Sequence, residues 1–313
     1  PMLSKLMPLR EAIAAFVPDG ASVAMGLALE SLIPFAAGHE MMRQRKRGLT
    51  LIGPISDMLF DQLIGAGCAA KVIAAWVGNV SAGLGHNYRR ATEDKGRQGE
   101  SSGNKVAVED HSNFSIALAL KAGAMGVPYL PTRSLLGTSL LESNPSLRVT
   151  FGDDGMKLVR VPAVTPDVTI VHVQRADAEG GAHAWGNLGI MDEAALAARQ
   201  VIVIAEEIVT PEVIRSDPNR VLVPAFKVCA VVHAPGGAHP SPVQGFYGRD
   251  HAAYQEYHGE SRTAEGFVGW LDGWVVSVKD RAEYLEKLGA ARWGALAVKE
   301  HRFAAAVDYG ISK

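Results

Sequence analysis

The sequence predicts an α/β fold built on an open, mostly parallel sheet with helices on both faces. Short apolar runs rich in β-branched residues recur along the 313 residues, and helical segments lie between them. These runs are continuously apolar rather than alternating, which is typical of strands buried on both faces. The alternation of strands with helices indicates parallel pairing. Since no linker is long enough to divide the chain, we expect one domain over residues 1–313.

The predicted strands fall into two groups along the chain. The first group comprises residues 22–26, 49–53, 71–78 and 105–110. The second group comprises residues 167–173, 200–207 and 227–235. The polar segment 93–105 is rich in Gly and Ser, so we expect it to be a surface loop.

Helix signals lie between and beside these strands. The predicted helices span residues 8–16, 56–67, 191–200 and 280–293. Pro8 takes a first-turn position, and Ser56 is the expected N-cap of its helix. The basic run 43–47 is expected to be a solvated helix C-terminus, where cations complement the helix dipole.

The composition excludes several classes of partner. Hydrophobic residues make up 48% and charged residues 20%, as in ordinary soluble proteins. The net charge of −2 provides no basic footprint, so we expect no nucleic acid partner. The apolar segment 21–38 is broken by Glu30 and Pro34 and lacks a basic leader. We therefore expect no signal peptide, no membrane span and a cytoplasmic location.

The cysteines and histidines do not indicate a metal site. Cys68 and Cys229 lie far apart in apolar surroundings, and we expect buried free thiols in a reducing compartment. His233, His239 and Asp250 are separated by a Gly- and Pro-rich turn without metal-ligand spacing. We expect their segment to form a rigid, buried corner, and we expect no metal.

Five polar side chains crowd into residues 109–113, between a predicted strand and an apolar helix that follows it. Asp110 or Ser112 can cap that helix, but capping needs one oxygen and not five polar groups. Ligands bind at the carboxyl ends of strands in open α/β sheets. Free N–H groups of a first helical turn favour negative charge there, and the Asn113 amide adds a neutral donor. From the residues alone, a ligand site and a plain helix cap both remain open.

Other strand ends carry glycines, at Gly26 and in residues 52–57 and 76–85. They serve either as turns or as a ligand-facing edge. None forms a dinucleotide-binding or phosphate-binding glycine pattern, and no nucleophile elbow is present. Glu100 lies in the polar loop, which is a poor setting for a nucleophile.

The chain resembles the A subunits of the family I CoA-transferases, most closely the glutaconate CoA-transferase A-subunit type. The resemblance runs nearly end to end through an ordered set of segments. They are PLREAIAAFVPDGASVAMG (8–26), DMLFDQLIGAGCAAKVIAAWVGN (57–79), VEDHSN…AGAMGVPYLP (108–131), DVTIVHVQRADAEGGAHAWG (167–186), EEIVTPEVIRSDPNR (206–220), APGGAHPSPVQGFYGRD (234–250) and WVVSVKDRAEYLEKLGA (274–290).

The resemblance implies a two-subunit enzyme, often an A2B2 heterotetramer. Such enzymes move CoA between an acyl-CoA and a carboxylic acid through a glutamyl-CoA thioester. The nucleophilic glutamate normally belongs to the B subunit, so the resemblance implies that this chain carries half an active site. Coenzyme A is a substrate, and no permanently bound cofactor is expected.

The resemblance also implies roles for individual residues. Asn113 matches a glutamine of fused ketoacid CoA-transferases that hydrogen-bonds the acyl oxygen, so it is our catalytic residue, although its side chain is one methylene shorter. The backbone near Gly26 is the second expected donor. Leu27 and Ala28 depart from the family's glycine-rich loop, which implies an altered or bulkier acyl pocket. The expected substrate- and CoA-binding residues are Gly26, Glu30, Ser31, Pro54, Gly78, Asn79, Glu109 and Ser112.

Three details qualify these roles. Gly78 and Asn79 match a strand-end turn of the family. Pro54 and Ile55 replace an Asn pair of the ketoacid enzymes, which disfavours a ketoacid-specific pocket. Glu109 is expected to shape the site rather than to react, and so are its neighbours Asp110 and His111.

Two other functions remain open at this stage. The chain also resembles A subunits of hydrolases that cleave CoA-thioester ring products, which carry a carboxylate at the position of Asn113. The third possibility is a non-catalytic assembly subunit, since Leu27 and Ala28 depart from the family loop.

Overall fold

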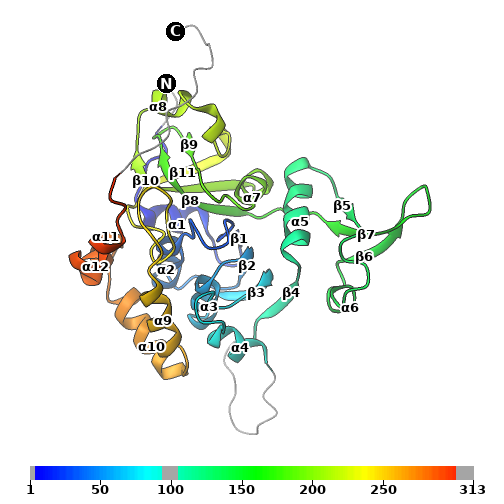
Figure 1. Ribbon diagram of the computed structural model, residues 1–313, viewed down its shortest axis with the longest axis horizontal. Helices are drawn as coiled ribbons and strands as arrows, with labels where there is room; N and C mark the ends of the chain where they lie inside the picture. Colours follow the sequence, from blue (N-terminus) through cyan, green and yellow to red (C-terminus); the bar gives the residue numbers. More distant parts are fainter. Residues whose placement is uncertain (1–3, 94–104, 301–313) are drawn as a thin grey trace.

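The computed structural model describes residues 4–93 and 105–300, and it contains a main sheet with the strand order β11-β10-β8-β1-β2-β3-β4 (Figure 1). All six neighbouring pairs along this order are parallel. The predicted fold class is therefore confirmed. The strands are β1 (Ser22–Ala24), β2 (Leu49–Ile55), β3 (Ala69–Trp76), β4 (Ala107–Asp110), β8 (Val168–Ala176), β10 (Gln200–Ile208) and β11 (Val228–His233), and the short β9 (Ala182–His183) pairs antiparallel with β8.

Helices cover both faces of this sheet. The helices are α1 (Leu9–Phe16), α2 (Phe35–Arg43), α3 (Met58–Gly65), α4 (His86–Thr92), α5 (Asn113–Met125), α6 (Leu140–Ser143), α7 (Met191–Ala197), α8 (Pro211–Arg215), α9 (His251–Glu260), α10 (Ala264–Leu271), α11 (Arg281–Leu288) and α12 (Ala290–Leu296). A π-helical turn, Asp272–Val276, continues α10, and two short 3₁₀ turns lie at Pro218–Arg220 and Ala225–Lys227.

The side chains on the two faces of the sheet pack into two separate hydrophobic clusters. In β10, Ile202 and Ile204 belong to the cluster formed with α1, α2, α3, α9 and α10. Val201 and Val203 belong to the opposite cluster, formed with α5 and α7. This alternation follows from the two-residue period of a strand. It explains why the strand reads as one continuous apolar run, because both of its faces are buried.

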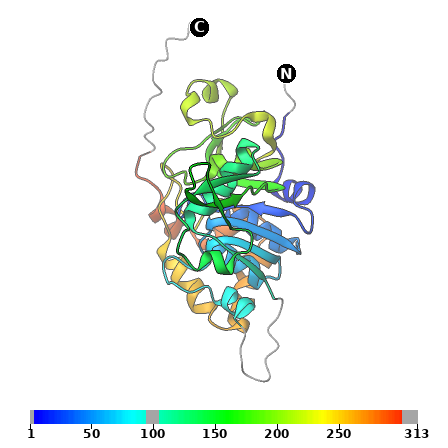
Figure 2. The same ribbon diagram turned by 90° about the vertical axis from the view of Figure 1, so that its right-hand side faces the viewer.

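A second sheet of three antiparallel strands follows α5. The strands β5 (Tyr129–Thr132), β7 (Lys157–Pro162) and β6 (Arg148–Phe151) lie beside the main sheet (Figures 1 and 2). Their small core includes Leu135, Leu147 and Val159. We did not predict these strands, because they are short and one face is exposed, so they lack a continuous apolar run.

Three predicted helix boundaries are wrong in detail. Asp57, and not Ser56, caps α3, because its carboxylate accepts the N–H of Met58 at 3.0 Å. The Ser56 hydroxyl instead donates to the Met25 carbonyl at 2.8 Å. The predicted helix 280–293 is broken at Gly289, whose φ of 91° ends α11 before α12 begins. The predicted helix 191–200 ends at Ala197, since β10 already begins at residue 200.

The two thiols are free, but they differ in burial. Cys68 is fully buried, and burial raises the pKa of its thiol to about 12. Cys229 is only half-buried, which corrects the prediction for that residue, and desolvation raises its pKa to about 11. Both thiols are therefore protonated and unreactive near neutral pH.

Candidate functional site

The predicted site residues gather along one edge of the main sheet, where the parallel strands end. Gly26, Glu30 and Ser31 follow β1, while Gly78 and Asn79 follow β3. Pro54 is a buried residue near the end of β2, and Glu109 to Asn113 form the corner between β4 and α5. The chain moves outward from β1 to β4 and then returns to β8 on the other side of β1. Such a reversal of strand order marks the usual ligand crevice of an open α/β sheet.

The loop after β1 is held in an unusual backbone conformation. Gly26, Leu29 and Leu32 have φ angles of 66°, 64° and 55°. Leucine rarely adopts such angles, so surrounding contacts must hold the loop in place. The Ser31 hydroxyl provides one, because it donates to the Asn187 carbonyl at 3.2 Å. Glu30 is exposed at the tip of the loop.

The two departures from the family loop lie in the protein interior. Leu27 is 2% exposed and Ala28 is 0% exposed, and both belong to the core cluster under α5 and α7. The Leu27 carbonyl accepts the N–H of Ile190 at 3.0 Å. Their side chains therefore pack in the hydrophobic core and do not fill the edge of the sheet where the strands end.

The turn after β3 is closely packed. A Cβ on Gly78 would lie 2.5 Å from the Trp76 ring and 2.8 Å from the Gly83 carbonyl, so only glycine fits. The Asn79 amide donates to the Tyr254 carbonyl at 2.8 Å and accepts the N–H of Ser81 at 3.1 Å. Since both ends of this amide are occupied within the chain, Asn79 shapes the edge but does not present free donors to a ligand.

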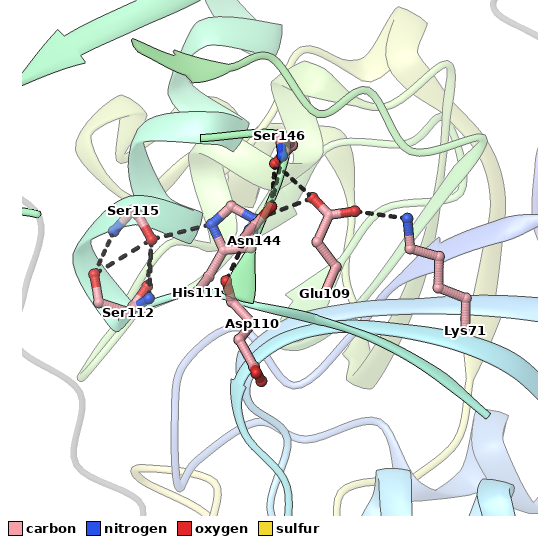
Figure 3. A network of polar contacts seen from close by, with 8 residues as sticks. All are labelled: Lys71, Glu109, Asp110, His111, Ser112, Ser115, Asn144 and Ser146. Carbon is pink, nitrogen blue, oxygen red and sulfur yellow. Dashed lines mark hydrogen bonds and ion pairs between the residues drawn. The ribbon is translucent and has the colours of Figure 1, made fainter. Parts of the chain in front are cut away.

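The corner between β4 and α5 contains a network of polar side chains (Figure 3). The Glu109 carboxylate accepts a hydrogen bond from Lys71 Nζ at 2.6 Å and another from Ser146 Oγ at 3.2 Å. His111 Nε2 lies 3.3 Å from the same carboxylate. The hydrogen bond from His111, followed by those from Lys71, lowers the pKa of Glu109 to about 2. Glu109 is therefore an ionised, fully engaged structural anion.

The network continues from His111 into the first turn of α5. The imidazole is completely buried, and its Nδ1 lies 3.0 Å from Ser115 Oγ. Ser115 Oγ accepts the N–H of Ser112 at 2.9 Å, and Ser112 Oγ accepts the N–H of Ser115 at 3.0 Å. These two bonds form a capping box. Asn144, from the loop after α6, donates to the Asp110 carbonyl at 2.8 Å and closes the corner from the other side.

Glu109, His111 and Ser115 have the connectivity of a carboxylate–imidazole–hydroxyl triad, but they do not form a nucleophilic site. Ser115 is 0% exposed, and its oxygen already accepts a backbone N–H. A nucleophile must be reachable by the substrate. The triad-like arrangement is thus a structural part of the helix cap.

Asn113 lies just beyond this network and is exposed as the first residue of α5. Within residues 4–93 and 105–300, the backbone N–H groups of Asn113 and Phe114 have no acceptor. Among the residues that the structure describes, the positive end of the helix therefore presents two N–H groups and the Asn113 side-chain amide without hydrogen-bond partners. Ser112 is the N-cap and its side chain is used in the capping box.

Asn113 and Gly26 mark two ends of the edge rather than a single pocket. They follow β4 and β1, which are three positions apart in the sheet. At the usual strand spacing this separation is about 14 Å. Only an extended ligand can therefore approach both.

A groove of about 310 Å³ runs beside the same corner. It lies between the ends of β3 and β4 and the start of α4, and its lining includes Trp76, Leu84, Tyr88, Val108 and Asp110. The Asp110 side chain points away from the polar network (Figure 3). A largely apolar groove with the exposed Asp110 carboxylate in its lining can hold a partly polar ligand or a partner side chain.

The segment 233–250 forms a buried structural corner. His239 is 0% exposed, 3.0 Å from Asp250 and 2.8 Å from the Tyr284 hydroxyl. Burial lowers the pKa of His239 to about 4. His233 lies apart, with its Nε2 3.2 Å from the Glu206 carbonyl, so the three residues do not converge. In the part of the chain that the structure describes, no cluster of three or more His, Cys, Asp or Glu side chains is placed to hold a metal.

Comparison with known proteins identifies the family. Residues 6–234 match the family model described as coenzyme A transferase. The chain belongs to the coenzyme A transferase family. It is 39% identical over 291 residues to the A subunit of 3-oxoadipate CoA-transferase from Pseudomonas knackmussii, and the match covers 93% of this chain and 100% of the relative.

Solved structures agree with this assignment. A chain of glutaconate coenzyme A-transferase from Acidaminococcus fermentans superposes with a TM-score of 0.87 and 32% identity, covering 98% of this chain and 99% of that one. A more distant relative in sequence is the cholesterol ring-cleaving hydrolase IpdA subunit of Mycobacterium tuberculosis. It is 31% identical over only 175 residues, which are 53% of this chain and 59% of the relative. This CoA-transferase chain is thus of the A-subunit type, like the A subunits of 3-oxoadipate and glutaconate CoA-transferases.

Sequence reasoning missed four residues of the corner in this CoA-transferase chain. Ser115 had a readable signal, because it stands three residues after Ser112, the spacing of a capping box. Lys71, Asn144 and Ser146 had no such signal, since they reach the corner from another strand and from a loop more than thirty residues away.

We predict that Gly26→Ala destabilises the protein more than Gly126→Ala. Both glycines have nearly the same φ, 66° and 70°, but a Cβ on Gly26 would lie 2.5 Å from Ser56, whereas Gly126 has open space. We expect the positive φ to cost about 1 kcal/mol at both positions and the overlap to add about 2 kcal/mol at Gly26. Equal losses of unfolding free energy in urea would contradict the close approach.

We predict that Glu109→Gln lowers the free energy of unfolding by about 2 kcal/mol near pH 7. The folded-state pKa of about 2 lies below the ordinary value of 4.5. The stabilisation is therefore complete well above pH 4.5 and is lost as the pH falls towards 2. Urea unfolding from pH 7 downward measures this trend, with Glu286→Gln at an exposed position as control. A difference from wild type that does not shrink on acidification would contradict the assignment.

Proposed function

We propose that this chain is the A half of a two-subunit CoA-transferase, completed by a B-type subunit, with A2B2 as the expected assembly. The observation that carries the proposal is the exposed donor group at the start of α5. Asn113 and Phe114 are exposed, and the Asn113 amide and the backbone N–H groups of both residues have no acceptor among the residues described. They suit an oxyanion that develops during attack on a thioester carbonyl.

The nucleophile is proposed to come from the partner. Glu109 is held by Lys71 and His111, and Glu206 is buried against His172 and Tyr247. Glu30 and Asp110 are exposed, so this chain alone provides neither with the ordered, dry setting that a nucleophile needs. A carboxylate of the B subunit that faces Asn113 completes the site.

The reaction then proceeds in balanced steps. The partner's carboxylate attacks the acyl-CoA carbonyl, an acyl–glutamyl anhydride forms, and the CoA thiolate leaves. The thiolate attacks the glutamyl carbonyl, which releases the carboxylic acid and leaves glutamyl-CoA. A second acid reverses these steps and departs as its CoA thioester. Each attack places negative charge on a carbonyl oxygen, where the Asn113 amide donates a hydrogen bond.

An apolar rim around the corner supports a protein partner. Five large side chains near the ends of β3 and β4 are between 36% and 53% exposed. They are Trp76, Val80, Leu84, Val108 and Phe114. Trp76, Leu84 and Val108 line the same groove, and clustered exposed apolar surface marks interaction sites. We propose that the B subunit covers this rim and excludes water from the thioester.

The proposed cofactor use, acid substrate and location follow from the assignment as a CoA-transferase A subunit. Coenzyme A is a substrate, and no permanently bound cofactor is invoked. The acid is proposed to be a dicarboxylic acid, because the relatives are named for 3-oxoadipate and glutaconate. No helix among the residues described is long and apolar enough to cross a membrane. A cytoplasmic location would keep both free thiols reduced.

We predict that the isolated chain lacks transferase activity and gains it when it is co-expressed with its B-type partner. In that complex, Asn113→Ala should lower kcat about 100-fold, the usual effect of removing one oxyanion donor. CoA transfer from an acyl-CoA to a panel of dicarboxylic acids measures both effects. Full activity from the chain alone would refute the half-site proposal.

Isotopic exchange distinguishes the transferase from a hydrolase of the same fold. We predict that the complex exchanges labelled carboxylic acid into acyl-CoA, because a glutamyl-CoA intermediate can return CoA to an acid. Water-directed cleavage requires no such exchange. Thioester loss without exchange would favour the hydrolase, for which the exposed Asp110 beside the groove is the candidate carboxylate.

We predict that Phe114→Asp weakens association with the B subunit at least about 10-fold, because it places a charge in the apolar rim. Phe226→Asp is the matched control, since Phe226 is 83% exposed and lies on a 3₁₀ turn elsewhere. Analytical ultracentrifugation of the mixed subunits measures both variants. Equal affinity for both would argue against the rim as the interface.

A further inference from the structure

The network behind Asn113 is more extensive than a helix cap requires. A capping box needs only two hydroxyl groups, and Ser112 and Ser115 supply them. The structure adds a completely buried imidazole, His111, and a largely buried carboxylate, Glu109. Burying such groups is unfavourable unless every one of them is hydrogen-bonded. The corner satisfies this condition with partners from three separate parts of the chain, which are β3, the turn 109–115 and the loop after α6.

The hydrogen bonds of this network form a continuous path from Glu109 to the start of α5. His111 Nε2 lies 3.3 Å from the Glu109 carboxylate, which accepts its hydrogen bond. The other ring nitrogen, Nδ1, is hydrogen-bonded to Ser115 Oγ, 3.0 Å away. The Ser115 oxygen in turn accepts the N–H of Ser112 at 2.9 Å. The negative charge of Glu109 is thus connected by successive hydrogen bonds to the N-cap of α5.

The network is also clamped from both sides. Lys71 in β3 holds the Glu109 carboxylate at 2.6 Å. The Asn144 side-chain amide donates a hydrogen bond to the Asp110 carbonyl, and its nitrogen lies 3.4 Å from His111 Nε2. The Ser146 hydroxyl donates a hydrogen bond to the Glu109 carboxylate. Asn144 and Ser146 belong to the antiparallel unit that follows α5 (Figures 1 and 3). The strand-to-helix turn is therefore held between the main sheet and the small sheet.

The next residue along the chain is Asn113. The turn that the network fixes is the one that sets the direction of the Asn113 amide and of the two free N–H groups. Oxyanion stabilisation depends on donors that are already in place before charge develops. A shift of about 1 Å in a positioned group can cost on the order of 100-fold in rate.

We propose that His111 is a positioning residue, which acts through Asn113 by holding the first turn of α5 in its donor geometry. This inference rests on the proposed function. His111 does not touch the substrate, since its ring is completely buried. Its removal leaves the Asn113 amide present but poorly aimed.

The experiment is a double-mutant cycle in the complex with the B subunit. His111→Leu removes both ring contacts, and His111→Gln keeps one donor and one acceptor. Each is made alone, and His111→Leu is also combined with Asn113→Ala. We expect His111→Leu to lower kcat about 10-fold to 30-fold with KM changed less than about 3-fold. His111→Gln should restore most of the lost rate.

Coupling is the decisive readout. In the Asn113→Ala background, His111→Leu should lower kcat less than about 2-fold, because the donor that it positions is already absent. The same fold-loss in both backgrounds would overturn the proposal. Ser115→Ala breaks the same chain of bonds at its other end and should show the same coupling, which keeps the test available if His111→Leu does not fold.

Hydrogen exchange of the isolated chain provides a readout that does not depend on activity. His111→Leu should raise the exchange rate of the peptide that covers the first turn of α5. Tyr257→Phe is the control, since it removes buried hydrogen bonds to Asp61 and Asn87 away from this corner. Exchange equal to wild type, or an equal kcat loss in the control, would overturn the positioning role. A wild-type complex without CoA transfer would refute the proposed function instead, and exchange would still report on the turn.

Discussion

The constraint on which the rest of this structure depends is the parallel sheet that is buried on both faces. Parallel strands require helical crossovers, so every strand of the main path ends at the same edge. Loops that are far apart in sequence, after β1, β2, β3 and β4, therefore become neighbours. The reversal of strand order at β1 and β8 leaves this edge open to a ligand. The predicted site residues share one edge because of this topology, before any individual side chain is considered.

The loops at that edge are held in place by two different kinds of interaction. The loop after β1 and the turn after β3 are fixed mainly by steric exclusion. Ser56 approaches Gly26 and Trp76 approaches Gly78, so that no side chain fits at either glycine. The corner after β4 is instead fixed by hydrogen bonds among buried polar groups. Close steric contacts shape the loops after β1 and β3, whereas hydrogen bonds hold the turn that leads into Asn113.

The departures from the family pattern lie beneath this edge rather than on it. Leu27 and Ala28 pack within the core beneath α5 and α7. Their side chains thus change the support of the loop rather than the open surface, which weakens the argument for a non-catalytic subunit. Pro54 is likewise buried in β2, and Asn79 uses its amide for internal contacts. Of the residues expected to meet a substrate, Asn113 and Glu30 are the exposed ones at this edge.

The sequence by itself determined the fold class, because continuous apolar runs are local signals, and its strand-end polar clusters predicted where a candidate site would lie. It also predicted a cap at the start of α5, although it left Asp110 and Ser112 as equal candidates. The tertiary structure decided what could not be read locally. Glu109 is an anion held by Lys71, and Asn144 closes the corner, because strand pairing and the antiparallel unit bring them there. Hydrogen-bond partners over such separations depend on how elements pack, and packing leaves no periodic mark in a single sequence.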